Sequence, residues 1–308
     1  MDKGLKELGR AFIVTLLVLL IQLAGWYYSN SLALLGDSAH VFSDGLAIGA
    51  SFSAMWLALN AKSARRTFGF HRVEVFAAAF NGMLLVLMAL LIVYEAFQRF
   101  GSFQEISAAP MLVTSLIGLA GNLYVAYHLQ HEENLNVRSA FIHAAGDALS
   151  SIGVLIGGVL ILLTGQYAID IAVSLLVAGI ILFSAYSLLR NSLSILLESA
   201  PYEADEGRIK AAVIEVKGVR GVHDIHIWRT CSEFVFAMMH VETDNIALID
   251  ARALSQEIEE KLLHGFGITH TTIQFEPYGC SCQSQKMCNI LEHKKRHAHG
   301  GKSERKSQ

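Results

Sequence analysis

The first two thirds of the chain contain six long apolar stretches separated by short polar segments. Each stretch approaches the roughly 20 residues that a helix needs to cross a bilayer. The pattern predicts a membrane domain of six helices over residues 11–192, preceded by a short segment, 1–10. The predicted helices fall at about 11–30, 33–58, 73–96, 107–128, 138–164 and 168–190.

From about residue 193 the pattern becomes that of a soluble domain. Helical spacing and strand-like alternation predict five elements, in the order helix, strand, strand, helix, strand, at 202–216, 222–229, 234–241, 246–263 and 268–275. This order indicates a small open-faced α+β sandwich over residues 193–279. The last segment, 280–308, is polar, basic and contains several histidines, which predicts a flexible tail.

Composition agrees with a membrane protein. Of the 308 residues 53% are hydrophobic, and the mean hydropathy is +0.43, too apolar for an ordinary soluble domain. The net charge of −3 indicates neither a nucleic-acid partner nor an acidic substrate. The N-terminus resembles the start of a signal peptide, but no cleavage site stands out, so the first helix is expected to be retained.

The basic residues sort to one side of the predicted membrane domain. They precede the first helix and occupy the second-to-third and fourth-to-fifth connections and the segment after the sixth helix. The opposite connections carry almost none, with Arg99 as the exception. The positive-inside rule therefore predicts that both termini are cytoplasmic, which agrees with an even number of helices.

Two His-x-x-x-Asp patterns lie within predicted membrane helices, His40 with Asp44 and His143 with Asp147. A four-residue spacing places both side chains of each pair on one helix face. Two such helices facing each other would supply two imidazoles and two carboxylates, a set suited to Zn²⁺. The alternative for each pair is a His–Asp hydrogen bond within its own helix or contacts with water.

The charge of this set also indicates an exchange of ions. With neutral imidazoles it carries −2, which compensates a divalent cation, and Asp37 shares the helix face of His40 and Asp44. Metal binding to such a set expels protons, which gives a physical basis for metal/proton antiport.

The predicted helix bounds place the two pairs at different depths, about 15 Å apart at 1.5 Å per residue. A shared site therefore requires the fifth helix to begin near Asn134 and the second near Ser31.

Four segments of the chain resemble the zinc-type branch of the cation diffusion facilitator family, over roughly residues 8–278. They are the run from Leu34 to Asp44, the run from His143 to Asp147, Thr67 to Glu74, and Gly221 to Asp224. The resemblance implies a homodimeric exporter of Zn²⁺, often also of Cd²⁺ or Co²⁺, in exchange for H⁺. It implies a transport site of His40, Asp44, His143 and Asp147, and a location in the cell (inner) membrane.

The resemblance also concerns the soluble domain, which looks like a ferredoxin-like, metallochaperone-like dimerisation module that binds zinc. Its ligand positions correspond to His223, His240 and Glu276, with Gln274 where the family has a histidine. His226 and His270 are further candidates, and strand alternation puts His226 on one face with Asp224 and His223 on the other. A charge pair between dimer halves would correspond to Arg72 and Glu198.

The tail carries thiols beside imidazoles, with Cys280, Cys282 and Cys288 followed by three histidines. These groups can capture Zn²⁺ or Cu⁺. Their spacing matches no established zinc-finger pattern, so a tail with free thiols is an equal alternative.

Three functional classes are compatible with an intramembrane metal site. The prediction is a proton-coupled zinc exporter and not an enzyme. An intramembrane metalloprotease would use His-Glu-x-x-His, a motif that this sequence lacks. A metal-sensing membrane protein without transport is the third class.

Overall fold

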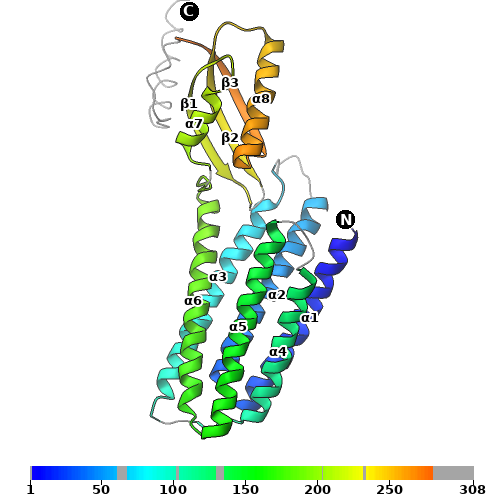
Figure 1. Cartoon of the computed structure of the whole chain (residues 1–308), viewed down its shortest axis with the longest axis vertical. Coiled ribbons are helices and arrows are strands. Elements are labelled where there is room, and N and C mark those ends of the chain that lie inside the picture. The colour runs from blue at the N-terminus through cyan, green and yellow to red at the C-terminus, as the bar shows by residue number, and fades with distance from the viewer. Residues whose placement is uncertain are drawn as a thin grey trace, which may run out of the picture. The chain divides into compact units, whose positions relative to one another are not determined.

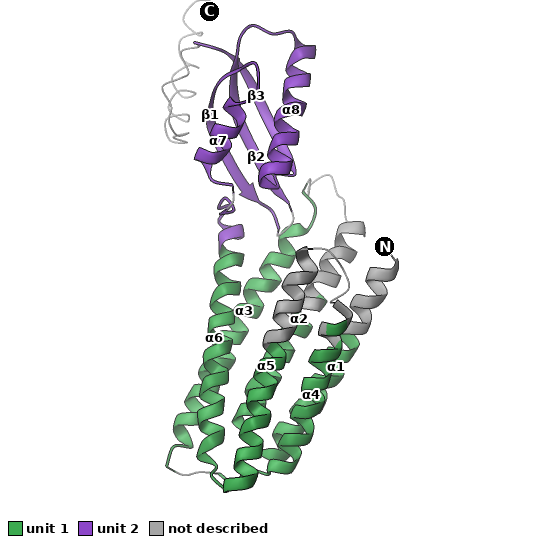
Figure 2. Ribbon diagram, viewed as in Figure 1, with its two compact units in different colours: residues 1–193 green, residues 194–308 purple. Residues whose placement is uncertain are grey.

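The computed structural model describes residues 2–60, 68–101, 104–129, 135–202, 204–231 and 234–279. For 2–11, 47–48, 50–60, 125–126, 128–129 and 135–146 it describes the backbone only. The chain divides into two compact units, residues 1–193 and 194–308 (Figure 2).

The first unit is a bundle of six long helices that run side by side (Figure 1). Its helices have 22 to 30 residues and are α1 (Asp2–Ser29), α2 (Leu32–Asn60), α3 (His71–Gln98), α4 (Ala108–Leu129), α5 (Leu135–Thr164) and α6 (Ala168–Leu196). Within the described residues, four helices have apolar stretches long enough to cross a membrane: Phe12–Ser29, His71–Gln98, Asp147–Thr164 and Ala168–Leu196. The predicted membrane domain of helices is confirmed.

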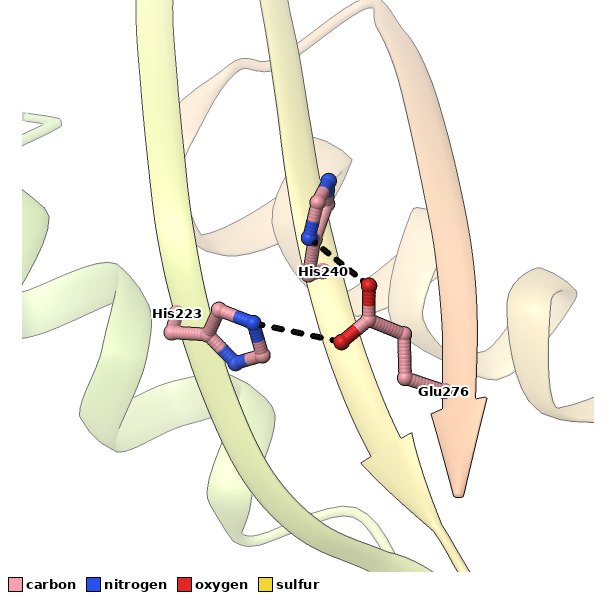
Figure 3. Close-up of side chains that lie close together, drawn as sticks. All are labelled: His223, His240 and Glu276. Carbon is pink, nitrogen blue, oxygen red and sulfur yellow. Dashed lines mark ion pairs between the residues drawn. The ribbon is translucent and has the colours of Figure 1, made fainter. Parts of the chain in front are cut away.

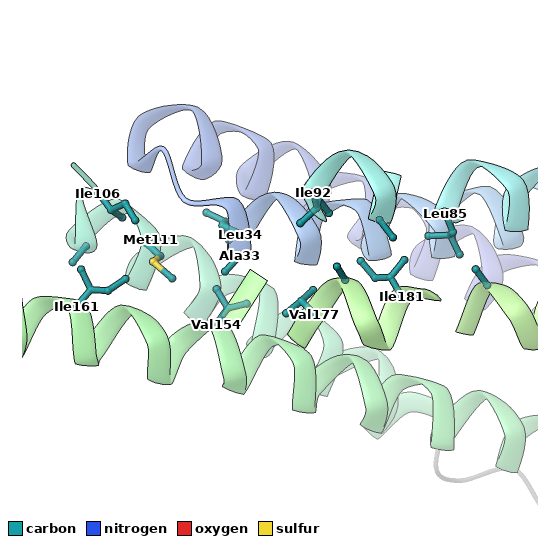
Figure 4. Packing of buried hydrophobic residues seen from close by; sticks show 14 residues of the cluster. Ala33, Leu34, Leu85, Ile92, Ile106, Met111, Val154, Ile161, Val177 and Ile181 are labelled. Carbon is teal, nitrogen blue, oxygen red and sulfur yellow. The ribbon is translucent and has the colours of Figure 1, made fainter. Parts of the chain in front are cut away.

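The core of the bundle is formed by side chains from α2 to α6 (Figure 4). Leu34 of α2, Ile92 of α3, Met111 of α4, Val154 of α5 and Ile181 of α6 are at most 1% exposed. Because lipid is as apolar as these side chains, close packing rather than water exclusion holds the helices together in a membrane.

Buried polar groups fix the first turn of α2 to α6. Asp170 is fully buried and accepts hydrogen bonds from Ser31 Oγ (2.5 Å) and from the backbone N–H groups of Leu32 (2.8 Å) and Ala33 (3.4 Å). These N–H groups have no partner within α2 because they belong to its first turn. The carboxylate of another helix therefore caps the helix that carries His40.

The second unit is a three-stranded sheet with two helices on one face (Figure 1). Its elements are α7 (Glu206–Ile214), β1 (Val219–Arg229), β2 (Val235–Thr243), α8 (Leu248–Phe266) and β3 (His270–Pro277). The strand order is β1-β2-β3; β1 and β2 are antiparallel, whereas β2 and β3 are parallel and joined through α8. The predicted order of helices and strands is confirmed.

The core of this unit lies between the helices and the sheet. Ile209 of α7 and Ile258 and Leu262 of α8 are fully buried against Met239 and Val241 of β2. Because side chains alternate along a strand, the residues between these on β2, such as His240, belong to the opposite face of the sheet.

Candidate metal centres

Three ligand-type side chains meet between α2 and α5. His40 Nε2 lies 2.5 Å from Asp147 Oδ1, and both residues are only 7% exposed. Asp44 is half-buried beside them, and one ligand atom from each of the three residues lies within 4.8 Å of the others. The hydrogen bond runs between helices, unlike the alternative in which each histidine bonds the aspartate of its own helix.

The two helices are antiparallel with a clear register. Asp37 of α2 contacts Ser151 of α5, and one turn further along both helices His40 contacts Asp147. The next turn on each helix carries Asp44 and His143. The side chain of His143 lies outside the described residues, although its backbone belongs to α5.

The helix bounds agree with those that a shared site requires. α5 begins at Leu135 and α2 at Leu32, close to the required starts at Asn134 and Ser31. Hydropathy alone placed the start of the fifth helix at residue 138 because the residues just before it include the polar Asn134 and Asn136.

Neutral polar groups of other helices support α2 and α5 near these ligands. Asn81 of α3 is 4% exposed and donates through Nδ2 to Ser43 Oγ (2.7 Å) and to the Ser43 carbonyl (3.2 Å). Asn122 of α4 donates through Nδ2 to Ser151 Oγ (3.5 Å). Both asparagines therefore bond across helices, as a polar side chain in an apolar helix is expected to do.

Two polar residues at this place were not predicted as part of a site. Gln22 of α1 donates to Asp37 Oδ2 at 2.6 Å, and Ser151 of α5 donates to the same carboxylate at 3.1 and 3.3 Å. The signal for Gln22 was present, since it is the one amide within the apolar stretch 11–29 of the first helix. A serine in a membrane helix carries no comparable signal because helix packing commonly uses it.

A second group of ligand-type side chains lies on the sheet face that α7 and α8 leave open (Figure 3). Glu276 of β3 forms ion pairs with both imidazoles, with His240 Nδ1 at 3.1 Å and His223 Nε2 at 3.4 Å. The two rings lie edge to face with centroids 5.2 Å apart. The carboxylate of Glu242, 6% exposed, lies 3.2 Å from His223 Nδ1. Two imidazoles and a carboxylate at this spacing suit a divalent metal.

Around this group the strand alternation expected for β1 is wrong. The pairing of β1 with β2 shifts between His223 and His226, and Asp224 has a left-handed φ of 53°. An aspartate tolerates this conformation better than most residues. The bulge adds one residue to β1 relative to β2. His226 therefore lies on the same open face of the sheet as His223. There Asp224 contacts both His226 (3.0 Å) and His240 (3.8 Å).

The remaining candidates lie elsewhere. His270 is paired with Phe236 at the start of β3, whereas His240 pairs with Gln274, four residues further along that strand. Four residues of extended strand span about 13 Å, which separates His270 from the group of His223, His240 and Glu276. Gln274 donates to Glu276 at 2.7 Å and therefore orients a candidate ligand.

Two further predictions have no structural test. Cys280 and Cys282 lie outside the described residues, as does the rest of the tail. Arg72 and Glu198 belong to different compact units, so their pairing stays a prediction.

Comparison with known proteins finds a match for each of the two domains. Residues 8–197 match the cation efflux transmembrane domain, and residues 201–278 match the cytoplasmic domain of cation efflux proteins. The zinc transporter ZitB of Yersinia pestis is 35% identical over 305 residues, 97% of this chain and 97% of its own length. The cadmium, cobalt and zinc/H⁺-K⁺ antiporter of Bacillus velezensis is 35% identical over 286 residues, 89% of this chain and 91% of its own length.

Among solved structures, the metal-bound C-terminal domain of the CzcD transporter from Cupriavidus metallidurans is 33% identical to this chain. The match covers 24% of this chain and 99% of that domain, with a TM-score of 0.22.

Proposed function

The chain belongs to the cation diffusion facilitator family of multi-pass membrane cation efflux proteins, and from this premise we propose that it exports Zn²⁺ in exchange for protons. The proposed transport site consists of His40, Asp44, His143 and Asp147. The observation that supports it most is the contact of His40 with Asp147 across α2 and α5, with Asp44 in reach.

The ligand chemistry supports a divalent metal of intermediate softness. Imidazole nitrogen with carboxylate oxygen suits Zn²⁺, whereas oxygen alone would favour Mn²⁺ or Mg²⁺. The fourth ligand, His143, is proposed from the helix register, since one further turn on α2 and α5 brings Asp44 and His143 to the same level. Relatives named as zinc, cadmium and cobalt transporters support the same class of substrate.

Proton exchange is proposed from the atoms that a metal ion would take in this site. His40 Nε2 and Asp147 Oδ1 lie 2.5 Å apart, a distance at which a proton bridges the two atoms. A metal ion that takes the same nitrogen and oxygen atoms must displace that proton. Alternating access, in which the site opens first to the cytoplasm and then to the other side, would couple metal export to proton return.

The proposal also covers the orientation in the membrane, the oligomeric state and the metal site of the soluble unit. The distribution of basic residues supports cytoplasmic termini, and bacterial relatives support the inner membrane. The match of residues 201–278 to a cytoplasmic dimer domain supports a homodimer. In that domain His223, His240 and Glu276 are proposed to bind Zn²⁺.

Zinc flux in proteoliposomes tests the transport proposal. We expect a pH gradient to accelerate zinc accumulation and Asp147→Ala to abolish it. Leu149→Ala is the matched control, because Leu149 lies two residues away on α5 and is 68% exposed. Transport that survives both Asp44→Ala and Asp147→Ala would refute the site, and flux that ignores the pH gradient would refute proton coupling.

A metal sensor is the second candidate, because the open sheet face of the soluble unit holds its own group of ligands. Sensing without transport predicts zinc binding to the protein with no flux in the same proteoliposomes.

A further inference from the structure

A second polar cluster lies one helical turn from the transport site and contains Asp37, Gln22 and Ser151. Asp37 is 1% exposed, and Gln22 and Ser151 are fully buried. Gln22 Nε2 donates to Asp37 Oδ2 at 2.6 Å, and Ser151 Oγ donates to Asp37 Oδ2 at 3.1 Å and to Oδ1 at 3.3 Å. Among the described residues no lysine or arginine contacts Asp37.

A lone carboxylate at this depth requires a cation. In a membrane an ionisable side chain is expensive to bury and commonly marks the path of an ion. The hydrogen bonds from Gln22 and Ser151 are neutral, so they orient the carboxylate without balancing its charge. The titratable groups one turn away are His40 on α2 and Asp147 on α5. Among the described side chains that contact this cluster, Gln22 of α1 and Asn122 of α4 are neutral.

The space around Gln22 is shaped by a glycine. A Cβ at Gly118 of α4 would lie 2.3 Å from Gln22 Nε2, so a side chain there would push the amide away from its present place beside Asp37. The other amide atom, Gln22 Oε1, is buried and has no hydrogen-bond partner among the described residues. Rotation of the amide would turn this oxygen toward Asp37, where a cation between the two oxygens would satisfy both.

The chemistry of the cluster differs from that of the transport site. It offers only oxygen ligands: a carboxylate, an amide oxygen after rotation of the Gln22 amide, and a hydroxyl. Oxygen ligands prefer hard ions, and they can replace the hydration shell of an alkali cation. A single negative charge balances a monovalent ion, whereas Zn²⁺ would stay undercompensated and without a nitrogen ligand.

We propose that Asp37, Gln22 and Ser151 form a binding site for a monovalent counter-cation, a proton or an alkali ion, that is exchanged for zinc. This proposal rests on the proposed function and adds a cation to those that the transport site itself displaces. Occupancy would act on transport through both ligand helices, because Asp37 precedes His40 on α2 and Ser151 follows Asp147 on α5 by one turn.

The test measures zinc movement separately from its coupling to a gradient of a monovalent cation. Full-length protein in proteoliposomes is assayed for zinc-for-zinc exchange without gradients and for zinc uptake driven by a gradient of H⁺, K⁺ or Na⁺. Asp37→Asn removes the charge but keeps a side chain that can bond Gln22 and Ser151. We expect zinc-for-zinc exchange within about twofold of the unchanged protein and a loss of about tenfold in the gradient-driven component.

The gradient that loses its effect identifies the ion. Gln22→Met, which keeps the length of the side chain and removes the amide, should weaken the same gradient. Ser38→Ala is the control, since Ser38 is equally buried on α2 but donates only to the Leu34 carbonyl of its own helix.

The outcomes distinguish this proposal from the proposed function. If the unchanged protein moves no zinc, transport itself is refuted. If it is coupled and both Asp37→Asn and Gln22→Met stay equally coupled, the counter-cation site is refuted. If Asp37→Asn loses zinc-for-zinc exchange as well and Gln22→Met keeps full coupling, Asp37 is a structural residue and the proposal fails.

Discussion

In the proposed transport site, His40 supplies one of the two nitrogen ligands and is therefore expected to influence the choice among metals. His40→Asp would leave a site of three carboxylates and one imidazole, which is harder than the present set. We expect the preference for Zn²⁺ over Mn²⁺ to fall by about tenfold, equivalent to roughly 1.4 kcal/mol. Competition of Mn²⁺ and Cd²⁺ with labelled Zn²⁺ flux measures this change.

The control for this substitution is Phe42→Leu, two residues further on α2, where the side chain is 42% exposed. An unchanged metal preference in His40→Asp would show that His40 does not ligate the transported ion.

At the residue scale, the sequence predicts those side chains whose spacing along the chain determines that they share a helix face. His40, Asp44 and Asp147 follow from a four-residue spacing that any α-helix converts into one face. Gln22 and Ser151 do not, because each is a single polar residue whose meaning depends on which helix packs against it. Their convergence on Asp37 is a property of the packed bundle.

At the scale of elements, the capping of α2 by Asp170 is expected to stabilise the helix that carries two ligands of the proposed transport site. Asp170→Ala leaves Ser31 Oγ, Leu32 N–H and Ala33 N–H buried without their acceptor. Each unsatisfied group costs about 1–3 kcal/mol, so the three together are expected to lower the melting temperature of a bundle of this size by about 6 °C or more, at roughly 2–4 °C per kcal/mol. Thermal unfolding of the detergent-solubilised protein, followed by size-exclusion chromatography, measures the shift.

Asp170→Asn keeps one carbonyl oxygen as an acceptor and should fall between the alanine variant and the unchanged protein. Gln166→Ala, an exposed change in the connection that precedes α6, serves as the control. An alanine variant as stable as the control would mean that water or rearrangement satisfies the first turn of α2.

The elements themselves were largely predictable, because apolar length determines membrane helices and alternation determines strands. The exception is β1, where a bulge at Asp224 brings His223 and His226 to one face. A bulge depends on the pairing partner, β2, and on the tolerance of one aspartate for a left-handed backbone. A prediction from the strict alternation of side chains includes neither the pairing partner nor this tolerance.

At the scale of the molecule, the change of composition near residue 193 predicts a boundary, and the compact units divide after residue 193. Each unit contains its own group of metal-ligand side chains, one buried between helices and one on a sheet face. The sequence could not assign separate tasks to them, since histidines and carboxylates serve transport and regulation with the same chemistry.

The two groups should therefore be separable by substitution in the full-length protein. Zinc titration by calorimetry is expected to show two classes of sites, of which Asp147→Asn removes one and the double change His223→Ala with His240→Ala removes the other. Only the first class lies between membrane helices, so flux should vanish in Asp147→Asn and stay within about threefold in the double variant. His264→Ala on α8, a histidine outside both groups, is the control. If the double variant abolished flux while Asp147→Asn kept it, the soluble unit would hold the transported zinc, and the assignment of the two centres would be reversed.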